Sequence, residues 1–504
     1  MNDIISIVSF IFLLSNNKSI IGKICYNLDM ENRKDKTIIF EKYPIPKAFL
    51  ALCIPTIISQ LIAIIYNFSD TWFLGRIGEG SETAVAALGI IMPVYVIMAA
   101  IANLFGVGGA SVIARFLGKG ERIKARSAFV ISVYSGIAFA LLYALILIIF
   151  HEPLIRLVGG TEETYSLIFN YMIITMIIGA LPSIMNQLFG HLVRSVGAAF
   201  QSSIGMSLGV ILNIILDPLF MFIIIKDNPL VGAAVATLIS NIIASLYFII
   251  YILLTKKNIS TYSLNPKEFT FKEGILKEIV SIGFPAALAT TLAMVSNIFA
   301  NVLVNKPTNI SAVAGLNIAK KANTLAFHSL MGTTQGMLPF IAYNYASKNH
   351  QRRRDGIKAM YIVAVGFALI MLFLYLLFRE PLMRFFLPKD EEAVKYGSSF
   401  LAILAFAVPL CAISYSTNTI FQATGNKVFS FILSILRKGV FDIPLMYVLK
   451  YLTELDLNGV IVATPIAELG SAFIAIILLL ILNKKNKKLI KEEEQNGRND
   501  QEVN

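Results

Sequence analysis

Long apolar runs, separated by short polar segments, recur along nearly the whole chain. Each run is long enough for a helix to cross the roughly 30 Å hydrocarbon core of a bilayer. The runs lack the alternation over about ten residues that marks the strands of a membrane β-barrel. We therefore predict an all-α polytopic membrane protein with twelve transmembrane helices. The predicted spans are 48–74, 84–114, 127–150, 165–190, 196–225, 229–255, 276–304, 311–341, 357–378, 394–421, 428–451 and 457–482.

Composition and charge placement support this prediction. The chain has 504 residues, of which 56% are hydrophobic and 15% charged, and a mean hydropathy of +0.72, which excludes a water-soluble globular protein. The net charge of +12 does not indicate nucleic-acid binding, because the basic residues gather in alternate loops. These clusters lie at 115–126, 256–277, 348–358 and 484–488. The positive-inside rule places them, and both termini, on the cytoplasmic side of a multi-pass protein of the cell inner membrane.

Cysteine usage indicates neither a disulfide framework nor a metal site. Cys25, Cys53 and Cys411 are far apart in the chain. We expect no cofactor and no resident metal, and we expect the protein to act as a monomer in the lipid bilayer.

The first 29 residues form a separate segment. The apolar stretch Ile4–Leu14 is too short to span a bilayer, and it is preceded by Asp3 and no basic residue, unlike a signal peptide. Met30 opens a charged stretch suited to a cytoplasmic start. We interpret 1–29 as an interfacial or non-native N-terminal extension.

The chain contains an internal repeat. FHEPLIRLV at 150–158 matches FREPLMRFF at 378–386, and AVAALGI at 84–90 matches AVAGLNI at 312–318 with the same offset of 228. Two six-helix lobes follow, and because six is even, the repeat is parallel, with its pseudo-two-fold axis along the membrane normal. The predicted parts are a cytoplasmic segment at 30–46, an N-lobe at 47–255, a cytoplasmic linker at 256–275, a C-lobe at 276–482 and a charged cytoplasmic tail at 483–504.

Two aspartates, Asp70 and Asp217, interrupt the apolar runs of the first lobe. An ionisable group at membrane depth is costly unless it is paired or hydrated, so each is a functional candidate. Tyr66 lies four residues before Asp70, and Asn213 lies four residues before Asp217, so each pair shares a helix face. If the two faces meet, the pocket can bind a proton, because burial and a neighbouring like charge favour a protonated carboxyl group. It can equally bind sodium, which prefers oxygen ligands.

A structural interpretation of the same residues stays open at this point. Asp70 is close to Trp72, which is typical of a membrane interface. Asp217 precedes Pro218, which is typical of a residue that ends a helix.

The second lobe also holds charged residues within its apolar runs. They are Lys320, Lys321, Arg437, Lys438, Asp442 and Glu468. Lys438 and Asp442 are four residues apart and can pair along one helix. Structural pairing is one interpretation, and contact with an anionic group of a substrate is the other, because bases outnumber acids. Candidates for the lining of a substrate cleft are Met294, Phe327, Lys321 and Glu468.

Two motifs carry a family resemblance. YNxxD occurs at 66–70 and LNIxLDP at 212–218, and VGAAxAT at 231–237 supports them. With these motifs, from about residue 40 to 485, the chain resembles the multidrug and toxic compound extrusion (MATE) family, in its bacterial DinF-like and MepA-like branch. The resemblance implies twelve helices in two lobes and cation-coupled export of amphipathic, often cationic, drugs and other small organic compounds by alternating access.

The resemblance also implies a cation-coupling network in the N-lobe. Its members would be Tyr66, Asp70, Asn213, Asp217 and Thr237, with Asn186 and Gln187 as further candidates. Gly190 stands where similar proteins place a polar or acidic side chain, so we expect the network to be reduced at that corner.

Two other functions fit parts of the sequence. A flippase for lipid-linked saccharides would use a basic cleft, and the cations of the second lobe support this alternative. Such a flippase would not need the two aspartate motifs. An intramembrane transferase would need clustered acids or paired histidines, and the chain has no Asp-x-x-Asp cluster. We therefore predict a transporter rather than an enzyme.

Overall fold

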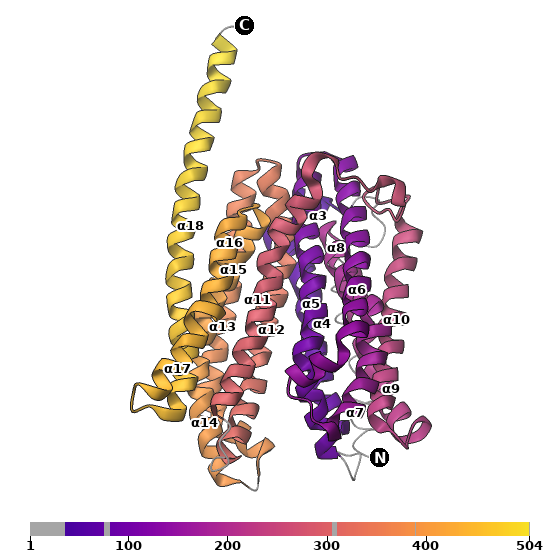
Figure 1. Cartoon of the computed structure of the whole chain (residues 1–504). Coiled ribbons are helices and arrows are strands. Elements are labelled where there is room, and N and C mark those ends of the chain that lie inside the picture. The colour runs from indigo at the N-terminus through magenta and orange to yellow at the C-terminus, as the bar shows by residue number, and fades with distance from the viewer. Residues whose placement is uncertain (1–35, 75–80, 305–309, 389, 503–504) are drawn as a thin grey trace.

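In a computed structural model, two bundles of membrane-length helices stand side by side (Figure 1). The structure describes residues 36–74, 81–304, 310–388 and 390–502, without the side chains of 66–72, 74, 81–82, 310 and 487–502. No strand occurs in these ranges, so the predicted all-α class is confirmed. The segment 1–29, interpreted above as an extension, lies outside the described residues.

Within the described residues, each lobe contains six membrane spans, some of them interrupted by a π-helical turn or a bend. The first contains α3 (Ile38–Glu41), α4 (Ile45–Leu74), α5 (Ser81–Gly118), α6 (Arg122–Leu157), α7 (Glu162–Met172), η1 (Ile173–Ile178), α8 (Ala180–Ser195), α9 (Ala199–Leu219), η2 (Phe220–Ile224) and α10 (Pro229–Thr255). The linker contains η3 (Pro266–Glu268) and η4 (Lys272–Gly274). The second lobe contains α11 (Ile275–Val304), α12 (Ile310–Ala346), α13 (His350–Phe386), α14 (Glu391–Ala405), α15 (Ala407–Ala423), α16 (Lys427–Ile435), η5 (Leu436–Asp442), α17 (Ile443–Tyr451) and α18 (Asp456–Glu502).

The helices account for the predicted membrane spans. Nine helical segments among the described residues are long and apolar enough to cross a bilayer, and the pair 162–178 and 180–195, bent by 50°, forms a tenth. The remaining two predicted spans are α12 and the series α16, η5 and α17. Backbone groups in hydrocarbon must find partners within their own segment, which is why these runs are helical throughout.

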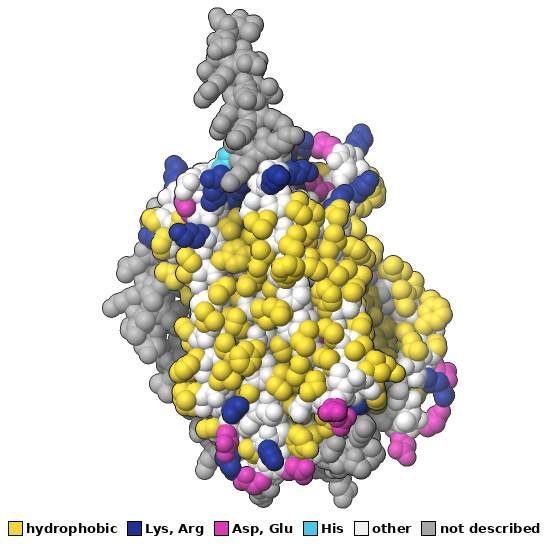
Figure 2. All heavy atoms as spheres, turned by 90° about the vertical axis from the view of Figure 1, so that its left-hand side faces the viewer, with side chains coloured by type: hydrophobic (Ala, Val, Ile, Leu, Met, Phe, Trp, Pro, Cys, Tyr) yellow, Lys and Arg dark blue, Asp and Glu magenta, His cyan; other side chains and the backbone are white. Residues whose placement is uncertain are grey.

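The outer surface has the distribution of a membrane protein. A broad apolar band covers one flank of the second lobe, and charged side chains gather above and below it (Figure 2). Leu369, Ile370 and Phe373 of α13 are among the exposed apolar side chains of the second lobe. One end of the molecule is where α4 and α11 begin and where α5 and α12 end. We call it the basic end, because the loops there contain clustered bases such as Lys119 and Arg122.

The two lobes meet along a seam with local two-fold character. In this lobe seam, α5 packs along α11, and α4 packs along α12. A methyl group on Gly108 would lie 2.2 Å from the backbone oxygen of Ile279, and one on Gly336 would lie 2.9 Å from that of Leu52. Gly108 and Gly336 are 228 residues apart, so the repeat places equivalent glycines against the first helix of the opposite lobe.

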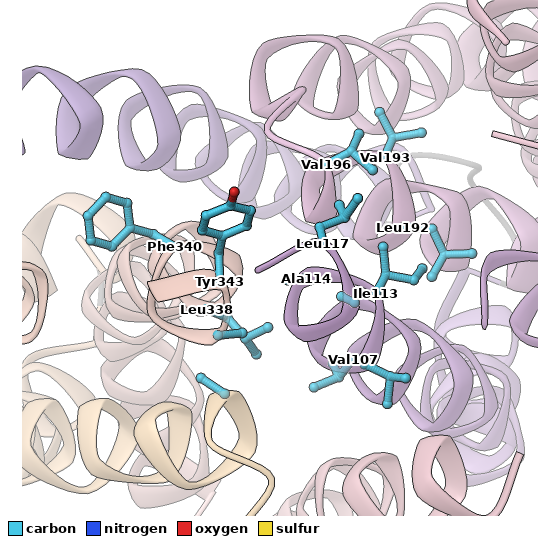
Figure 3. Close-up of a cluster of buried hydrophobic side chains, with 14 of the residues drawn as sticks. Val107, Ile113, Ala114, Leu117, Leu192, Val193, Val196, Leu338, Phe340 and Tyr343 are labelled. Atoms are coloured by element: carbon cyan, nitrogen blue, oxygen red, sulfur yellow. The ribbon is translucent and has the colours of Figure 1, made fainter. Parts of the chain in front are cut away.

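The lobe seam is closely packed toward the basic end. A methyl group on Gly283 would lie only 1.7 Å from the backbone oxygen of Leu104, so this approach of α11 to α5 requires glycine. Arg115 of α5 forms an ion pair of 2.6 Å with Glu278 of α11. Side chains of α5, α8 and α12 join one buried apolar cluster here, in which Leu338 belongs to α12 (Figure 3). The Cys53 thiol of α4 is also buried in the lobe seam, 3.4 Å from the backbone oxygen of Thr333.

The linker between the lobes folds against α6. Arg126 of α6 forms an ion pair of 2.8 Å with Glu268. Tyr262 is buried beside the ring of Phe129, with 5.5 Å between centroids. Burial raises the pKa of the Tyr262 phenol well above its ordinary value of 10, so this anchor is neutral at physiological pH.

The short helix α3 lies across the basic end and contacts both lobes. Arg352 of α13 donates hydrogen bonds to the backbone oxygens of Ile39 (3.2 Å), Phe40 (2.5 Å) and Tyr43 (2.6 Å). On the other side, a methyl group on Gly197, in the turn between α8 and α9, would lie 3.1 Å from the Ile39 side chain. The segment 36–43 therefore contacts both lobes at the basic end.

Replacing Arg352 with glutamine should release this segment. Hydrogen bonds from a charged group contribute about 1.5–3 kcal/mol each when buried, and solvent at this half-buried site reduces that figure. We expect trypsin to cleave after Lys42 at least ~10-fold faster, as measured by mass spectrometry of the released peptides. Arg354→Gln, at an exposed position two residues away, is the control. Equal cleavage of both variants would contradict the bridging role.

Candidate functional site

A buried polar network surrounds Asp217 in the first lobe. Asp217 of α9 has an exposed fraction of 0%, and its Oδ1 accepts a hydrogen bond of 3.2 Å from the Asn213 amide. The same Asn213 nitrogen lies 3.2 Å from the Thr237 hydroxyl of α10. The structure thus brings together three of the residues that the sequence predicts for the cation-coupling network.

The network continues through one residue that the sequence interpretation missed. The Asn241 amide donates a hydrogen bond of 3.0 Å to the backbone oxygen of Thr237. Asn186 of α8 in turn donates to the Asn241 side-chain oxygen at 3.3 Å, which links the predicted candidate Asn186 to the rest. Asn241 lies four residues after Thr237 within an apolar run, so the spacing argument used for Asp217 and Asn213 could have found it.

The backbone after Asp217 stays helical but widens. α9 ends at Leu219 and passes directly into the π-helical turn η2, which ends at Ile224. Pro218 cannot donate a backbone hydrogen bond, and π-helical turns often occur at functional sites. Asp217 is therefore an interior residue of its membrane span and does not end the helix, contrary to the structural interpretation of the sequence.

The other residues that the sequence predicts for the cation-coupling network are not seen, in the described part of the chain, to join the hydrogen bonds around Asp217. Asp70 and Tyr66 are on α4, which packs along α9, but their side chains lie outside the described residues, so their part in the network stays a prediction. Gln187 is half-buried on α8 and has no hydrogen bond with the network among the described side chains. A methyl group on Gly190 would lie 2.7 Å from the Met206 sulfur, so Met206 fills the corner where similar proteins place a polar side chain.

A central cavity of about 360 Å³ lies between the lobes. The first lobe contributes Asn103 and Arg194, and the second contributes the predicted cleft residue Met294 together with Gln335 and Arg437. Arg194 is buried, and it donates a hydrogen bond of 3.2 Å across the lobe seam to Gln335. Amide and guanidinium groups therefore line an enclosure with apolar walls, which is the usual make-up of a site for small organic molecules.

The C-lobe candidates divide into lining and supporting residues. Phe327 lines a second cavity, described below, whereas neither Lys321 nor Glu468 is among the residues that line the two cavities. Glu468 has an exposed fraction of 0%, and its Oε1 lies 3.2 Å from Arg437 and 3.6 Å from Lys438. Glu468 therefore positions two bases.

Comparison with known proteins identifies the family. The MatE family model matches the chain twice, at residues 55–219 and 285–448, so each lobe is one copy of the same unit. The chain belongs to the MATE family. Multidrug export protein MepA of Staphylococcus aureus (strain MRSA252) is 32% identical over 447 residues, which cover 88% of this chain and 96% of that protein. MepA of Staphylococcus saprophyticus subsp. saprophyticus is 31% identical over 446 residues, with the same coverage.

Solved MATE structures have the same fold. A crystal structure of a MATE protein in complex with MaL6 has a TM-score of 0.83 at 24% identity and covers 91% of this chain and all of its own chain. A MATE family transporter of the MOP superfamily in its outward-facing conformation has a TM-score of 0.81, also at 24% identity, with the same coverage. The predicted two-lobed, twelve-helix fold of the MATE family is thereby confirmed, and MATE proteins are membrane transporters rather than enzymes.

Proposed function

We propose that this MATE protein is a multidrug exporter coupled to an inward flow of cations, either protons or sodium ions. The observation that carries the proposal is the buried carboxyl group of Asp217, held at membrane depth by Asn213 and linked through it to Thr237. The similarity to multidrug export proteins over most of the chain supports the substrate class, which is amphipathic, often cationic, organic compounds.

The basic end is the cytoplasmic end in this proposal, by the positive-inside rule. The close packing of the lobe seam at that end then makes the present conformation closed to the cytoplasm. Cation and substrate bind to states of opposite access, and neutralisation of Asp217 by the cation shifts the population between these states. One chain with its own central cavity suffices for this cycle, so the transporter acts as a monomer in the cell inner membrane.

The flippase alternative loses its main support in the second lobe. Two of the bases that favoured it are ion-paired, since Lys438 lies 2.8 Å from Asp442 and Arg437 lies 3.2 Å from Glu468. These pairs reduce the net charge that would attract a pyrophosphate-linked lipid.

Reconstituted protein can test the coupling and name the ion. Proteoliposomes are loaded with a fluorescent lipophilic cation such as ethidium and given a proton gradient, a sodium gradient or neither. We expect either the proton gradient or the sodium gradient to drive the dye from lower to higher dye concentration. An ionophore that dissipates the effective ion gradient should stop this movement. Equal dye movement under all three conditions would contradict cation coupling.

A further inference from the structure

The second lobe contains its own cavity, of about 300 Å³, beside the central one. It is lined by residues of α11, α12, α14, α15, η5, α17 and α18, and its apolar wall includes Phe327, Leu404 and Met446. The two cavities share part of their lining, namely Ala293, Asn297, Met331, Tyr415, Arg437 and Lys438. A molecule in the central cavity can therefore extend one of its groups into this C-lobe cavity.

The charges around the C-lobe cavity do not balance. Lys438 pairs with Asp442 at 2.8 Å, and Arg437 pairs with Glu468 at 3.2 Å, which leaves each of these carboxylates with a cation. Asp442 also accepts hydrogen bonds from Ser296 at 2.6 Å and Thr464 at 3.1 Å, so its oxygens are well supplied with donors.

Lys320 is the cation left over. Its Nζ donates a hydrogen bond of 3.1 Å to the neutral side chain of Asn301, and it forms no ion pair with a described carboxylate. The cations Lys320, Arg437 and Lys438 thus outnumber the carboxylates of Asp442 and Glu468 by one, and Lys320 lines the cavity. A surplus charge at membrane depth is costly, and a bound anion would compensate it.

A second polar group on the same helix face faces the cavity. Asn323, one turn beyond Lys320 on α12, has an exposed fraction of 4%, and neither its side-chain oxygen nor its side-chain nitrogen has a hydrogen-bond partner among the described residues. The nitrogen can donate to a carboxylate, whereas the oxygen needs a donor such as a water molecule. Buried amides normally have partners, so an unpartnered one in a cavity wall marks a place for a ligand or a water molecule. Lys320, Asn323 and Phe327 are spaced at three and four residues, which aligns an ammonium group, an amide and an aromatic ring along one helix face.

We propose that the C-lobe cavity binds the carboxylate of an amphipathic substrate, with Lys320 as its counter-ion and the Asn323 amide as a hydrogen-bond donor. The single surplus charge matches a monoanion, and the apolar wall accommodates the aromatic or aliphatic body that carries the carboxylate. The proposal rests on the proposed export function and deepens it, because it names the residues that recognise a carboxylate group on the substrate. A purely cationic compound gains nothing in this cavity, since Lys320 repels it.

A matched pair of dyes isolates the carboxylate. Rhodamine 110 carries a free carboxyl group, and rhodamine 123 is its methyl ester, so the two differ at that group alone. Fluorescence anisotropy of each dye with the purified full-length protein, without ion gradients, gives the two affinities. We expect the wild type to prefer the free acid, and Lys320→Gln to weaken binding of the acid by roughly ten- to a hundred-fold while ester binding changes less than about two-fold.

Two further variants complete the test. Lys320→Arg keeps the positive charge and should retain the preference for the acid, and Lys395→Gln, at an exposed position on α14, should leave both affinities unchanged. Ester binding serves as the check that Lys320→Gln is folded. The proposal is overturned if the wild type shows no preference for the acid or no binding of it, or if Lys320→Gln keeps the preference. Acid binding that depends on Lys320 without gradient-driven transport would instead overturn the proposed export function and leave this site standing.

Discussion

Replacing Asp217 with asparagine is expected to abolish export against a gradient. Asparagine keeps the shape of the side chain but removes the charge that a cation neutralises, so substrate and cation access are no longer linked. One charge moving through 100 mV supplies ~2.3 kcal/mol, which supports a concentration ratio of roughly fifty-fold. The ratio should fall to about one in the variant by the same relation, measured as steady-state dye accumulation in proteoliposomes under the driving gradient.

The control for this experiment is Asp227→Asn, in the exposed loop between η2 and α10. It removes the same charge outside the network and should accumulate dye as the wild type does. Substrate affinity without a gradient, within about two-fold of the wild type by the same anisotropy assay, would show that Asp217→Asn remains folded. If Asp217→Asn accumulates dye to the wild-type ratio, the coupling role of this carboxyl group is wrong.

Replacing Gly283 with valine is expected to prevent closure at the basic end. A side chain there would overlap the backbone of Leu104, and helix backbones cannot yield as a flexible side chain can. Overpacking of this kind costs about 1–3 kcal/mol, which shifts an equilibrium between two states by roughly 5- to 150-fold. The closed state should lose population by that factor, and transport should fall with it.

The native thiol of Cys53 reports this shift. It is buried in the lobe seam, so a water-soluble maleimide should modify it slowly in the wild type and several-fold faster in Gly283→Val. Cys53→Ser identifies the Cys53 signal among the three cysteines. Gly89→Val on α5 is the control, because a methyl group there meets nothing within 4 Å. Unchanged labelling and transport in Gly283→Val would show that the lobe seam adapts to the larger residue.

The sequence predicted the fold well because the bilayer restricts the choices. Apolar runs of this length can only be helices, and the matches at 150–158 and 378–386 predicted the repeat that the family model finds as two copies. The π-helical turns η1, η2 and η5 were not predicted, because one extra residue in a helical turn leaves little trace in an apolar sequence. Boundaries of the lobes, linker and tail stay predictions.

The candidate site was predicted in part. Asp217 is conspicuous as a charge in an apolar run, and its spacing of four residues points to Asn213, whereas no charged residue lies one helical turn from Asn241. In the second lobe, the predicted cleft residue is Lys321, but the residue that lines a cavity is its neighbour Lys320. The helical period distinguishes the two lysines. Lys320 is seven residues, or about two helical turns, from Phe327 and lies on the same helix face, whereas Lys321 lies on a neighbouring face. Residues that only tertiary packing brings together, such as Met206 against Gly190, leave no such pattern.

The paired glycines of the lobe seam also bear on the origin of the chain. Gly108 of the first lobe packs against α11, the first helix of the second lobe, and the equivalent Gly336 of the second lobe packs against α4, the first helix of the first lobe. The same surface of the repeated unit is therefore used on both sides of the lobe seam. That is the isologous contact of a two-fold homodimer. Two copies of a six-helix ancestor could thus have associated through this surface before their genes fused. An even number of crossings leaves each copy's end beside its partner's start on one side of the membrane, so a short linker was enough to join them.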